Sequence, residues 1–384
     1  MGVPARGQTP APAQPRILRV TKSGYDGQVP GPELRVKRGE AVWVRAVNEL
    51  DAPTAIHWHG VRLVNAMDGA PPLTQTPIAP GASFDYRFVA PDAGTFWYHP
   101  AQQTNARLYG ALLVAEPEPL DADREFTLIL TGPAAGDDNK FDNKFYVNGT
   151  DDATLAAPAH ARVRLRLLNA TASRILRLRV ADLRVVVMAT DGQPAQPFAA
   201  RDGQLTLGPG NRVDVFIDWP AAPEAAALMT IEGTNAGAAP IAKLISQAGA
   251  AGRVTQREDP KPLPANPLPE RMDFRDAFRL ETTIGQVRAA KAGAPLFSVR
   301  RGRTVMLGLS NPASENAFIH LHGHSFRLLD ALDDGWKPFW LDTMPIAPEG
   351  KSRIAFVADN PGKWLIEGLD GARIDDQKAW FEVT

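Results

Sequence analysis

Two short stretches of the chain carry pairs of histidines separated by one residue, a spacing that suits metal binding. One stretch reads IHWHG at 56–60, and the other reads FIHLHGHSF at 318–326. In an extended strand, alternate side chains lie on the same face, so the two imidazoles of each pair can converge on one ion. The candidate metal ligands in these stretches are His57, His59, His320 and His322.

The two stretches belong to an internal repeat. Residues 35–60 align without a gap to residues 298–323, so that His57 corresponds to His320 and His59 to His322. A third copy, AHARVRLRLLN at 159–169, is recognisable by its strand, but Leu178 stands where the first histidine would be. We therefore expect metal ligands in the first and third copies and a structural role for the middle one.

Composition excludes several classes of function. The 384 residues include 42 Lys and Arg against 43 Asp and Glu, a formal charge of −1, which argues against nucleic-acid or anionic-membrane binding. A metal ion, a small molecule or another protein remain as partners. There is no cysteine, which excludes disulfides, thiolate nucleophiles and thiolate-ligated metals.

Short runs of β-branched and aromatic residues alternate with Gly- and Pro-rich turns along the whole chain, a pattern typical of antiparallel sandwiches. The sequence predicts an all-β fold of three similar units, with a proline-rich linker before the third. The sequence has no run of about 18 apolar residues, which would predict a membrane span. The N-terminus is expected to be a Pro/Ala-rich tail rather than a signal peptide. The predicted domains are 16–117, 124–252 and 276–384, with the linker at 253–275.

At this point the chain resembles the three-domain multicopper oxidases, the family of laccases. The motifs that carry the resemblance are HWHG, MDG at 67–69, WYH at 97–99, HLHGH at 320–324 and the C-terminal frame GKW…WFEV. The resemblance covers nearly the whole chain. It implies three cupredoxin-like (Greek-key) β-sandwich domains, copper as the cofactor and a periplasmic or secreted location.

Five histidines match copper ligands of the family. His57 and His320 match the two type 2 ligands, and His59, His99 and His322 match three of the six type 3 ligands. The other ligand positions hold different residues. These are Ala101, Glu367 and Leu369 at the type 3 positions and Ala317, Gly368 and Arg373 at the type 1 positions.

A type 1 copper needs a thiolate and two imidazoles. The sequence therefore predicts a protein that has lost the type 1 centre and is not a competent laccase. We expect it to retain about one copper(II) in a type 2-like site between the first and third domains, with His57 and His320 close together and at most weak non-blue redox activity. Zinc is the expected substitute. The alternative is a copper-free scaffold or interaction protein of the bacterial cell envelope, in which these histidines only satisfy hydrogen bonds.

Two acidic residues have open roles. Asp68 matches a residue that relays protons near the copper cluster of the family, but a turn-forming Asp before Gly69 would produce the same dipeptide. Glu367 would lie opposite His322, where a carboxylate can replace an imidazole as a ligand. Two histidines and a carboxylate would make the open arrangement of non-haem iron sites.

Overall fold

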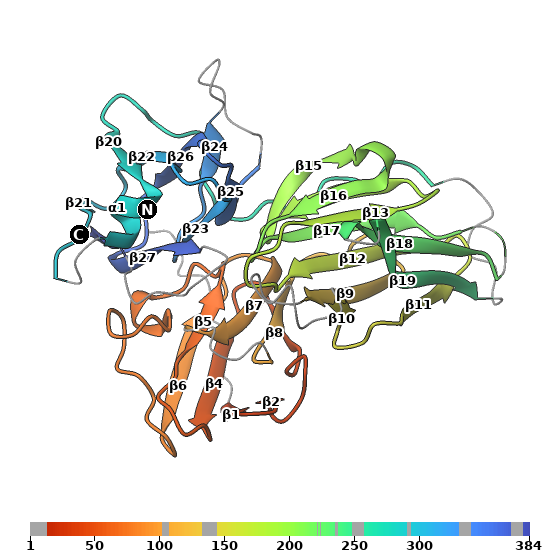
Figure 1. Cartoon of the computed structure of the whole chain (residues 1–384), viewed down its shortest axis with the longest axis horizontal. Helices are drawn as coiled ribbons and strands as arrows, with labels where there is room; N and C mark the ends of the chain where they lie inside the picture. The colour runs from red at the N-terminus through yellow and green to blue at the C-terminus, as the bar shows by residue number, and fades with distance from the viewer. Residues whose placement is uncertain are drawn as a thin grey trace, which may run out of the picture.

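Strands dominate the computed structural model. They hold 53% of the residues and helices hold 3%, which confirms the all-β prediction. Figure 1 shows three units, with the first in orange, the second in green and the third in blue. The structure describes residues 14–101, 107–132, 144–220, 222, 224–234, 237–247, 257–289, 293–329, 339–369 and 379–384.

The first unit consists of two four-stranded sheets. In one sheet β1 runs parallel to β4, and in the other β3 runs parallel to β8, while the remaining pairs are antiparallel. The first sheet has the order β2 (Gly24–Tyr25), β1 (Arg16–Thr21), β4 (Ala41–Asn48), β6 (Ser83–Val89). The second has the order β3 (Leu34–Lys37), β8 (Gly110–Ala115), β7 (Gly94–Pro100), β5 (Ile56–His59), and the short 3-10 helix η1 (Asn65–Met67) follows β5.

The second unit repeats this plan with longer sheets. Its parallel pairs are β9 with β12 and β11 with β19. One sheet has the order β10 (Tyr146–Val147), β9 (Arg124–Thr131), β12 (Arg162–Asn169), β17 (Arg212–Asp218), β14 (Val185–Thr190), β15 (Gln193–Ala199). The other has the order β11 (Ala153–Pro158), β19 (Gly237–Gln247), β18 (Ala226–Thr234), β13 (Leu176–Val180), β16 (Gln204–Leu207), with the 3-10 helix η2 (Arg201–Gly203) before β16.

The third unit again has parallel pairs at the same places, β20 with β22 and β21 with β28. One sheet has the order β20 (Phe278–Thr283), β22 (Thr304–Ser310), β26 (Lys351–Val357), β24 (Arg327–Leu329). The other has the order β21 (Phe297–Val299), β28 (Ala379–Val383), β27 (Gly362–Leu369), β23 (Ala317–Leu321), β25 (Thr343–Ile346), and the helix α1 (Ile284–Ala289) connects β20 to β21.

One asparagine of the repeat makes equivalent hydrogen bonds in all three units. Asn48, Asn169 and Asn311 lie at or next to the ends of the equivalent strands β4, β12 and β22, and all three are buried. The side-chain amide of each donates to two or more backbone carbonyls of the loop that follows and of a neighbouring segment. The repeat in the sequence is therefore a structural repeat, because the same side chain ties down the same loop three times.

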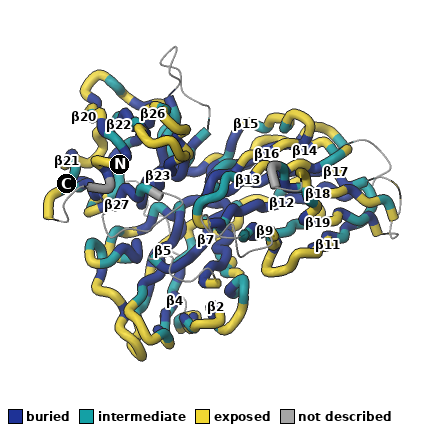
Figure 2. The backbone as a smooth tube through the Cα atoms, viewed as in Figure 1, coloured by how far each residue is buried: buried dark blue, intermediate teal, exposed yellow. Residues whose placement is uncertain are grey.

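The first and third units share one hydrophobic core, whereas the second has its own. A single cluster of buried apolar side chains includes Trp58 of the first unit and Trp364 of the third. Polar contacts reinforce this junction, since Asn65 donates to the carbonyl of Lys363 (2.6 Å) and Asn360 donates to the carbonyl of Leu63 (2.8 Å). Figure 2 shows that β5, β7 and β23 are buried where these units meet. The histidines on these strands are thereby held in a rigid interior.

Buried charges join the second unit to the first. The carboxylate of Asp214 on β17 accepts hydrogen bonds from Arg164, Arg166 and Thr95, and all four residues are buried. Every residue of β12 is buried because its second face lies against a neighbouring unit. In the linker, the side chain of Asn266 bonds both backbone groups of Ala93 (2.8 Å each), so this segment is docked rather than extended into solvent.

Candidate metal centre

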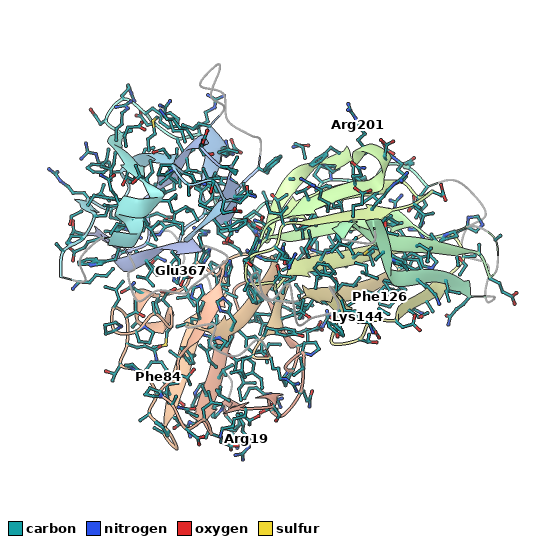
Figure 3. All side chains as sticks on the ribbon, viewed as in Figure 1. Arg19, Phe84, Phe126, Lys144, Arg201 and Glu367 are labelled. Carbon is teal, nitrogen blue, oxygen red and sulfur yellow. The ribbon has the colours of Figure 1, made fainter. Side chains whose placement is uncertain are left out.

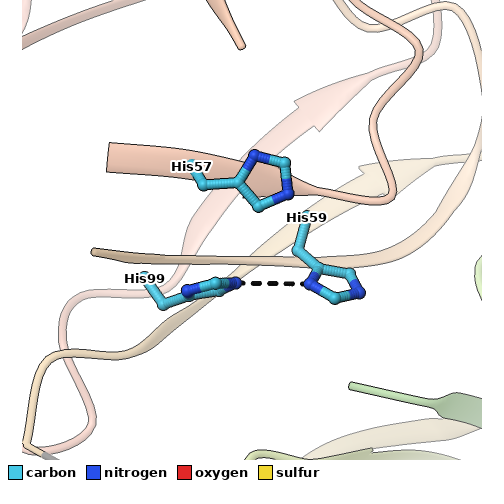
Figure 4. A group of neighbouring side chains, drawn as sticks. All are labelled: His57, His59 and His99. Carbon is cyan, nitrogen blue, oxygen red and sulfur yellow. Dashed lines mark hydrogen bonds between the residues drawn. The ribbon is translucent and has the colours of Figure 1, made fainter. Parts of the chain in front are cut away.

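Four strands place the candidate ligands. In the first domain β5 pairs with β7 so that His57 lies directly opposite His99. In the third domain β23 pairs with β27 so that His320 lies directly opposite Glu367. Figure 4 shows the rings of His57, His59 and His99 as close neighbours. All five predicted histidines are buried, with exposed fractions of 0–4%, and the structure brings them into one cluster.

The rings of His57 and His320 meet across the junction between the first and third domains. Their Nε2 atoms lie 3.1 Å apart. The Nδ1 atom of His57 lies 2.9 Å from the carbonyl of Asp68, and that of His320 lies 3.1 Å from the carbonyl of Asp342. A carbonyl oxygen only accepts hydrogen bonds, so both Nδ1 atoms carry a proton, and when both rings are neutral the two Nε2 lone pairs face each other.

Two facing lone pairs at this distance repel each other unless a cation lies between them. With metal–nitrogen bonds of about 2.0–2.1 Å, the separation of 3.1 Å corresponds to an angle of about 100° at a shared ion. That angle lies close to those of tetragonal and tetrahedral coordination. The His57–His320 pair is therefore the best-formed metal-binding pair in the cluster. We call such a pair of facing ligand atoms a metal seat.

The pair formed by His59 and His99 has the same character. His99 donates from Nδ1 to the carbonyl of Pro100 (2.9 Å), and His59 donates from Nε2 to the hydroxyl of Thr343 (3.0 Å), whose own proton goes to Asp342 (2.8 Å). The remaining nitrogens, Nδ1 of His59 and Nε2 of His99, face each other at 3.2 Å (Figure 4). These two imidazoles again present lone pairs to a common point.

His322 is held differently. Its Nδ1 donates to the carboxylate of Asp68 at 2.9 Å, and its Nε2 lies 3.6 Å from the nearest carboxylate oxygen of Glu367. Burial alone would lower the pKa of His322, but the charges of Asp68 and Glu367 outweigh it and raise the pKa to about 9. Burial would raise the pKa of Asp68, yet His322 and His57 hold it well below the usual range. Without a metal, the His322–Asp68 pair is therefore ionic at neutral pH.

The rings of His59, His99 and His320 stay neutral. Burial lowers the pKa of His59 and of His99 well below the ordinary value, with neighbouring histidines adding to the effect. Burial also lowers the pKa of His320 to about 4. Neutral imidazole is the form that binds a metal. These three rings are therefore in the ligating form at neutral pH.

Two aspartates support the cluster in an approximately two-fold pattern. The carbonyl of Asp68 anchors His57 and its carboxylate reaches across to His322 of the other domain. The carbonyl of Asp342 anchors His320, and its carboxylate lies 3.4 Å from Nε2 of His59 in the other domain. Second partners of this kind fix the orientation of metal-binding rings and raise their basicity.

The second domain, which holds none of the predicted ligands, nevertheless reaches the cluster. Arg212 of β17 is fully buried and pairs with both oxygens of Asp342, at 2.8 and 2.5 Å. Asp191 accepts from the backbone amides of Asp342 and Thr343 at 3.2 Å each. Burial and the nearby Asp342 raise the pKa of Asp191 to about 6, against the opposing effect of Arg212. The sequence did not single out Arg212, Asp191, Asp342 or Thr343.

The family's ligand positions that lack a histidine in this chain lie, where the structure describes them, on or next to the same strands as the five histidines. Ala317 is buried on β23, Ala101 follows β7, and Gly368 and Leu369 continue β27 after Glu367. Arg373 lies outside the described residues. His324 is buried against the rings of Phe356, Trp364 and Phe381. His160 lies outside the cluster, in the turn between β11 and β12.

The donor set suits a divalent transition metal. Three groups have ligand atoms that all lie within 4.8 Å of one another, namely His57–His59–His99, His57–His320–His322 and His59–His320–Asp342. Imidazoles with carboxylates match copper(II) and zinc(II) better than hard ions such as magnesium or soft copper(I).

Within the part of the chain that the structure describes, no helix has the length and apolar character to cross a membrane.

Comparisons with known proteins show the family of the chain. Models of multicopper oxidase domains match residues 13–119, 91–241 and 263–367. Multicopper oxidase MmcO of Mycobacterium tuberculosis is 30% identical over 432 aligned positions, covering 93% of this chain and 82% of that protein. Copper resistance protein A of Pseudomonas syringae pv. tomato is 28% identical, over 52% of this chain and 43% of its own length.

Solved structures give the same answer. The multi-copper oxidase from Pseudomonas thermotolerans superposes with a TM-score of 0.84 at 30% identity, covering 98% of this chain and 100% of that one. Lac15 from a marine microbial metagenome superposes with a TM-score of 0.81 at 30% identity, covering 96% and 100%. Both comparisons extend through all three domains and the linker. The chain belongs to the multicopper oxidase family.

Proposed function

We propose that this protein binds one copper(II) ion between its first and third domains, through Nε2 of His57 and Nε2 of His320. The observation that carries the proposal is the facing of two unprotonated nitrogens at 3.1 Å, with each ring locked from behind by a backbone carbonyl. Among divalent first-row ions copper(II) binds imidazole most tightly, and zinc(II) is the expected competitor. When bound, such a copper would supply a one-electron, non-blue redox centre.

The protein is not a competent laccase on this account. The chain has no cysteine, so no thiolate can hold a type 1 copper. Gly368 and Ala317 occupy positions that the family fills with type 1 ligands, and neither has a donor side chain. Without that centre, electrons from an organic substrate lack the usual route into the cluster. At most weak redox activity is expected.

Asp68 is the acidic residue best placed to assist chemistry at the site. It is 1% exposed, and its carboxylate lies between two candidate ligands, 2.9 Å from Nδ1 of His322 and 3.4 Å from Nδ1 of His57. We assign it two roles. It orients both rings, and it is the candidate proton relay beside the metal. Family membership supports a periplasmic or secreted location.

One observation favours the alternative of a copper-free scaffold. The first and third domains already share a continuous hydrophobic core, so their assembly does not depend on a metal. A chain that had lost copper altogether would keep this architecture. The two proposals differ in what copper(II) does to the folded protein.

Thermal unfolding with and without copper(II) separates them. Binding to the folded state alone at a hundredfold excess over the dissociation constant stabilises by about 2.7 kcal/mol. We expect this shift for the natural chain and its loss in the His57→Ala/His320→Ala double variant. Equal shifts in the two proteins would place the metal elsewhere, and the absence of a shift in both would favour the scaffold.

A further inference from the structure

The two-fold pattern of the cluster gives Glu367 a counterpart. In the first domain His57 on β5 lies opposite His99 on β7, and in the third domain His320 on β23 lies opposite Glu367 on β27. His57 and His320 are equivalent in the internal repeat, so Glu367 occupies the place that His99 occupies in the first domain. Figure 3 shows Glu367 where the third domain meets the first.

The same correspondence extends to the partner of each residue. His99 faces His59 at 3.2 Å, and Glu367 faces His322, the repeat equivalent of His59, at 3.6 Å. Asp68 holds the Nδ1 side of His322, so its Nε2 is the atom that points to the carboxylate. That Nε2 is buried, and among the described residues it has no hydrogen-bond partner. A buried nitrogen of this kind indicates a missing partner at the site.

We propose that Glu367 is a metal ligand, and that Glu367 and His322 form a second metal seat beside the His57–His320 pair. With bonds of about 2.0–2.2 Å, the separation of 3.6 Å corresponds to an angle of about 120° at the ion. The side chains of His322 and Glu367 are buried, with exposed fractions of 3% and 11%. Water held inside the cluster, rather than bulk solvent, would therefore complete the coordination of the ion. This inference extends the proposed function, on which it rests for the first ion.

The ligand chemistry sets the class of ion. The His57–His320 and His59–His99 seats offer imidazoles alone, whereas this seat offers one imidazole and one carboxylate. A carboxylate oxygen broadens the seat towards harder divalent ions such as manganese(II) and iron(II), in addition to zinc(II). Its negative charge also compensates part of the charge of a second cation placed close to the first. The seats of the cluster are therefore unequal, because two offer imidazoles alone and suit copper, whereas the Glu367–His322 seat also admits a harder ion.

Manganese(II) tests the second seat because its free aquo ion gives an EPR signal that diminishes on binding. The protein is first loaded with copper(II), freed of excess metal and analysed for copper, and is then titrated with manganese(II). The variants are Glu367→Gln, which keeps the shape and removes the charge, and Glu281→Gln, the same change at a side chain of the third domain that is 76% exposed. We expect the natural chain and Glu281→Gln to bind one manganese, and Glu367→Gln to lose it while retaining its copper.

The outcomes separate this inference from the proposed function. A natural chain that takes up one copper but no manganese, or a Glu367→Gln variant that binds manganese as well as the natural chain, would overturn the second seat alone. A chain that takes up no copper in the first step would contradict the proposed function. A Glu367→His variant adds a positive test, since restoring an imidazole should weaken manganese binding and raise the copper content.

Discussion

Arg212 links the second domain to the candidate metal centre through Asp342, and replacing it with Met tests that link. The side chain is fully buried. It pairs with both oxygens of Asp342, and it also donates to the carbonyls of Gly210 (3.0 Å) and Thr95 (3.2 Å). Burial would lower the pKa of Arg212, but Asp342 and Asp191 raise it, so the guanidinium is charged.

The Arg212→Met variant leaves two buried carboxylates, Asp342 and Asp191, without their cation. Breaking a buried pair in this way costs about 3–5 kcal/mol because the remaining charge is uncompensated. Such a loss is a large share of a typical stability of about 5–15 kcal/mol. Asp342 also supports His320 and His59, so copper affinity should fall by roughly 10–100-fold, as for other residues that orient metal ligands.

The measurements are urea unfolding of the metal-free protein and copper(II) titration of the folded one. Arg45→Met is the matched control, since Arg45 makes a similar two-bond pair with Asp85 (2.6 and 2.9 Å) but is 42% exposed. We expect the control to change neither quantity appreciably. If Arg212→Met unfolded at the same urea concentration as the natural chain, the buried pair would not be a structural requirement. If it bound copper unchanged, its link to the ligands would be wrong.

Two further predictions concern the same cluster. In the metal-free protein the pKa of His322 is raised to about 9. Its contribution to the free energy of unfolding is therefore fully present below about pH 6.5 and is lost as the pH rises to about 9. Urea unfolding across that window should show a decline of the order of 3 kcal/mol that is absent in His322→Gln; parallel curves would contradict the pairing with Asp68. Gly60 has a φ of +83°, and a Cβ there would lie 2.1 Å from the guanidinium of Arg212. Gly60→Ala should therefore destabilise the protein more than Gly302→Ala, which has the same φ and nothing within 4 Å, where only backbone strain of about 1–2 kcal/mol is expected. Equal losses in thermal unfolding would show that Arg212 can move aside.

Much of the fold could be predicted from the sequence because patterns within short stretches of residues determine it. The period-two alternation of strands such as β4, with every second residue buried, and the gap-free repeat predicted three β-sandwich domains. The His-x-His spacing predicted which rings share a face. It also placed His57 and His320 together, because neither pair alone completes a site.

Among the supporting residues only Asp68 was singled out, through the family resemblance, and the others could not be predicted for a physical reason. Beyond Gly60 and Gly323 the repeat loses its spacing, since Asp68 follows His57 by 11 positions and Asp342 follows His320 by 22. Arg212 begins a strand in which charged and apolar residues alternate, a pattern that indicates a solvent-facing side. In the structure that side is covered by another domain. Strand periodicity distinguishes the two faces of one sandwich but does not reveal which face a second domain will bury.

His57 and His320 are proposed to hold one copper(II) across the domain junction. The decisive measurements are copper analysis and EPR spectroscopy of the copper-loaded protein after removal of free metal. We predict about one copper per chain, with nitrogen hyperfine coupling from imidazole, no intense blue thiolate absorption, and loss of this signal in the His57→Ala/His320→Ala variant. An equal copper content and an unchanged spectrum in the double variant would contradict it.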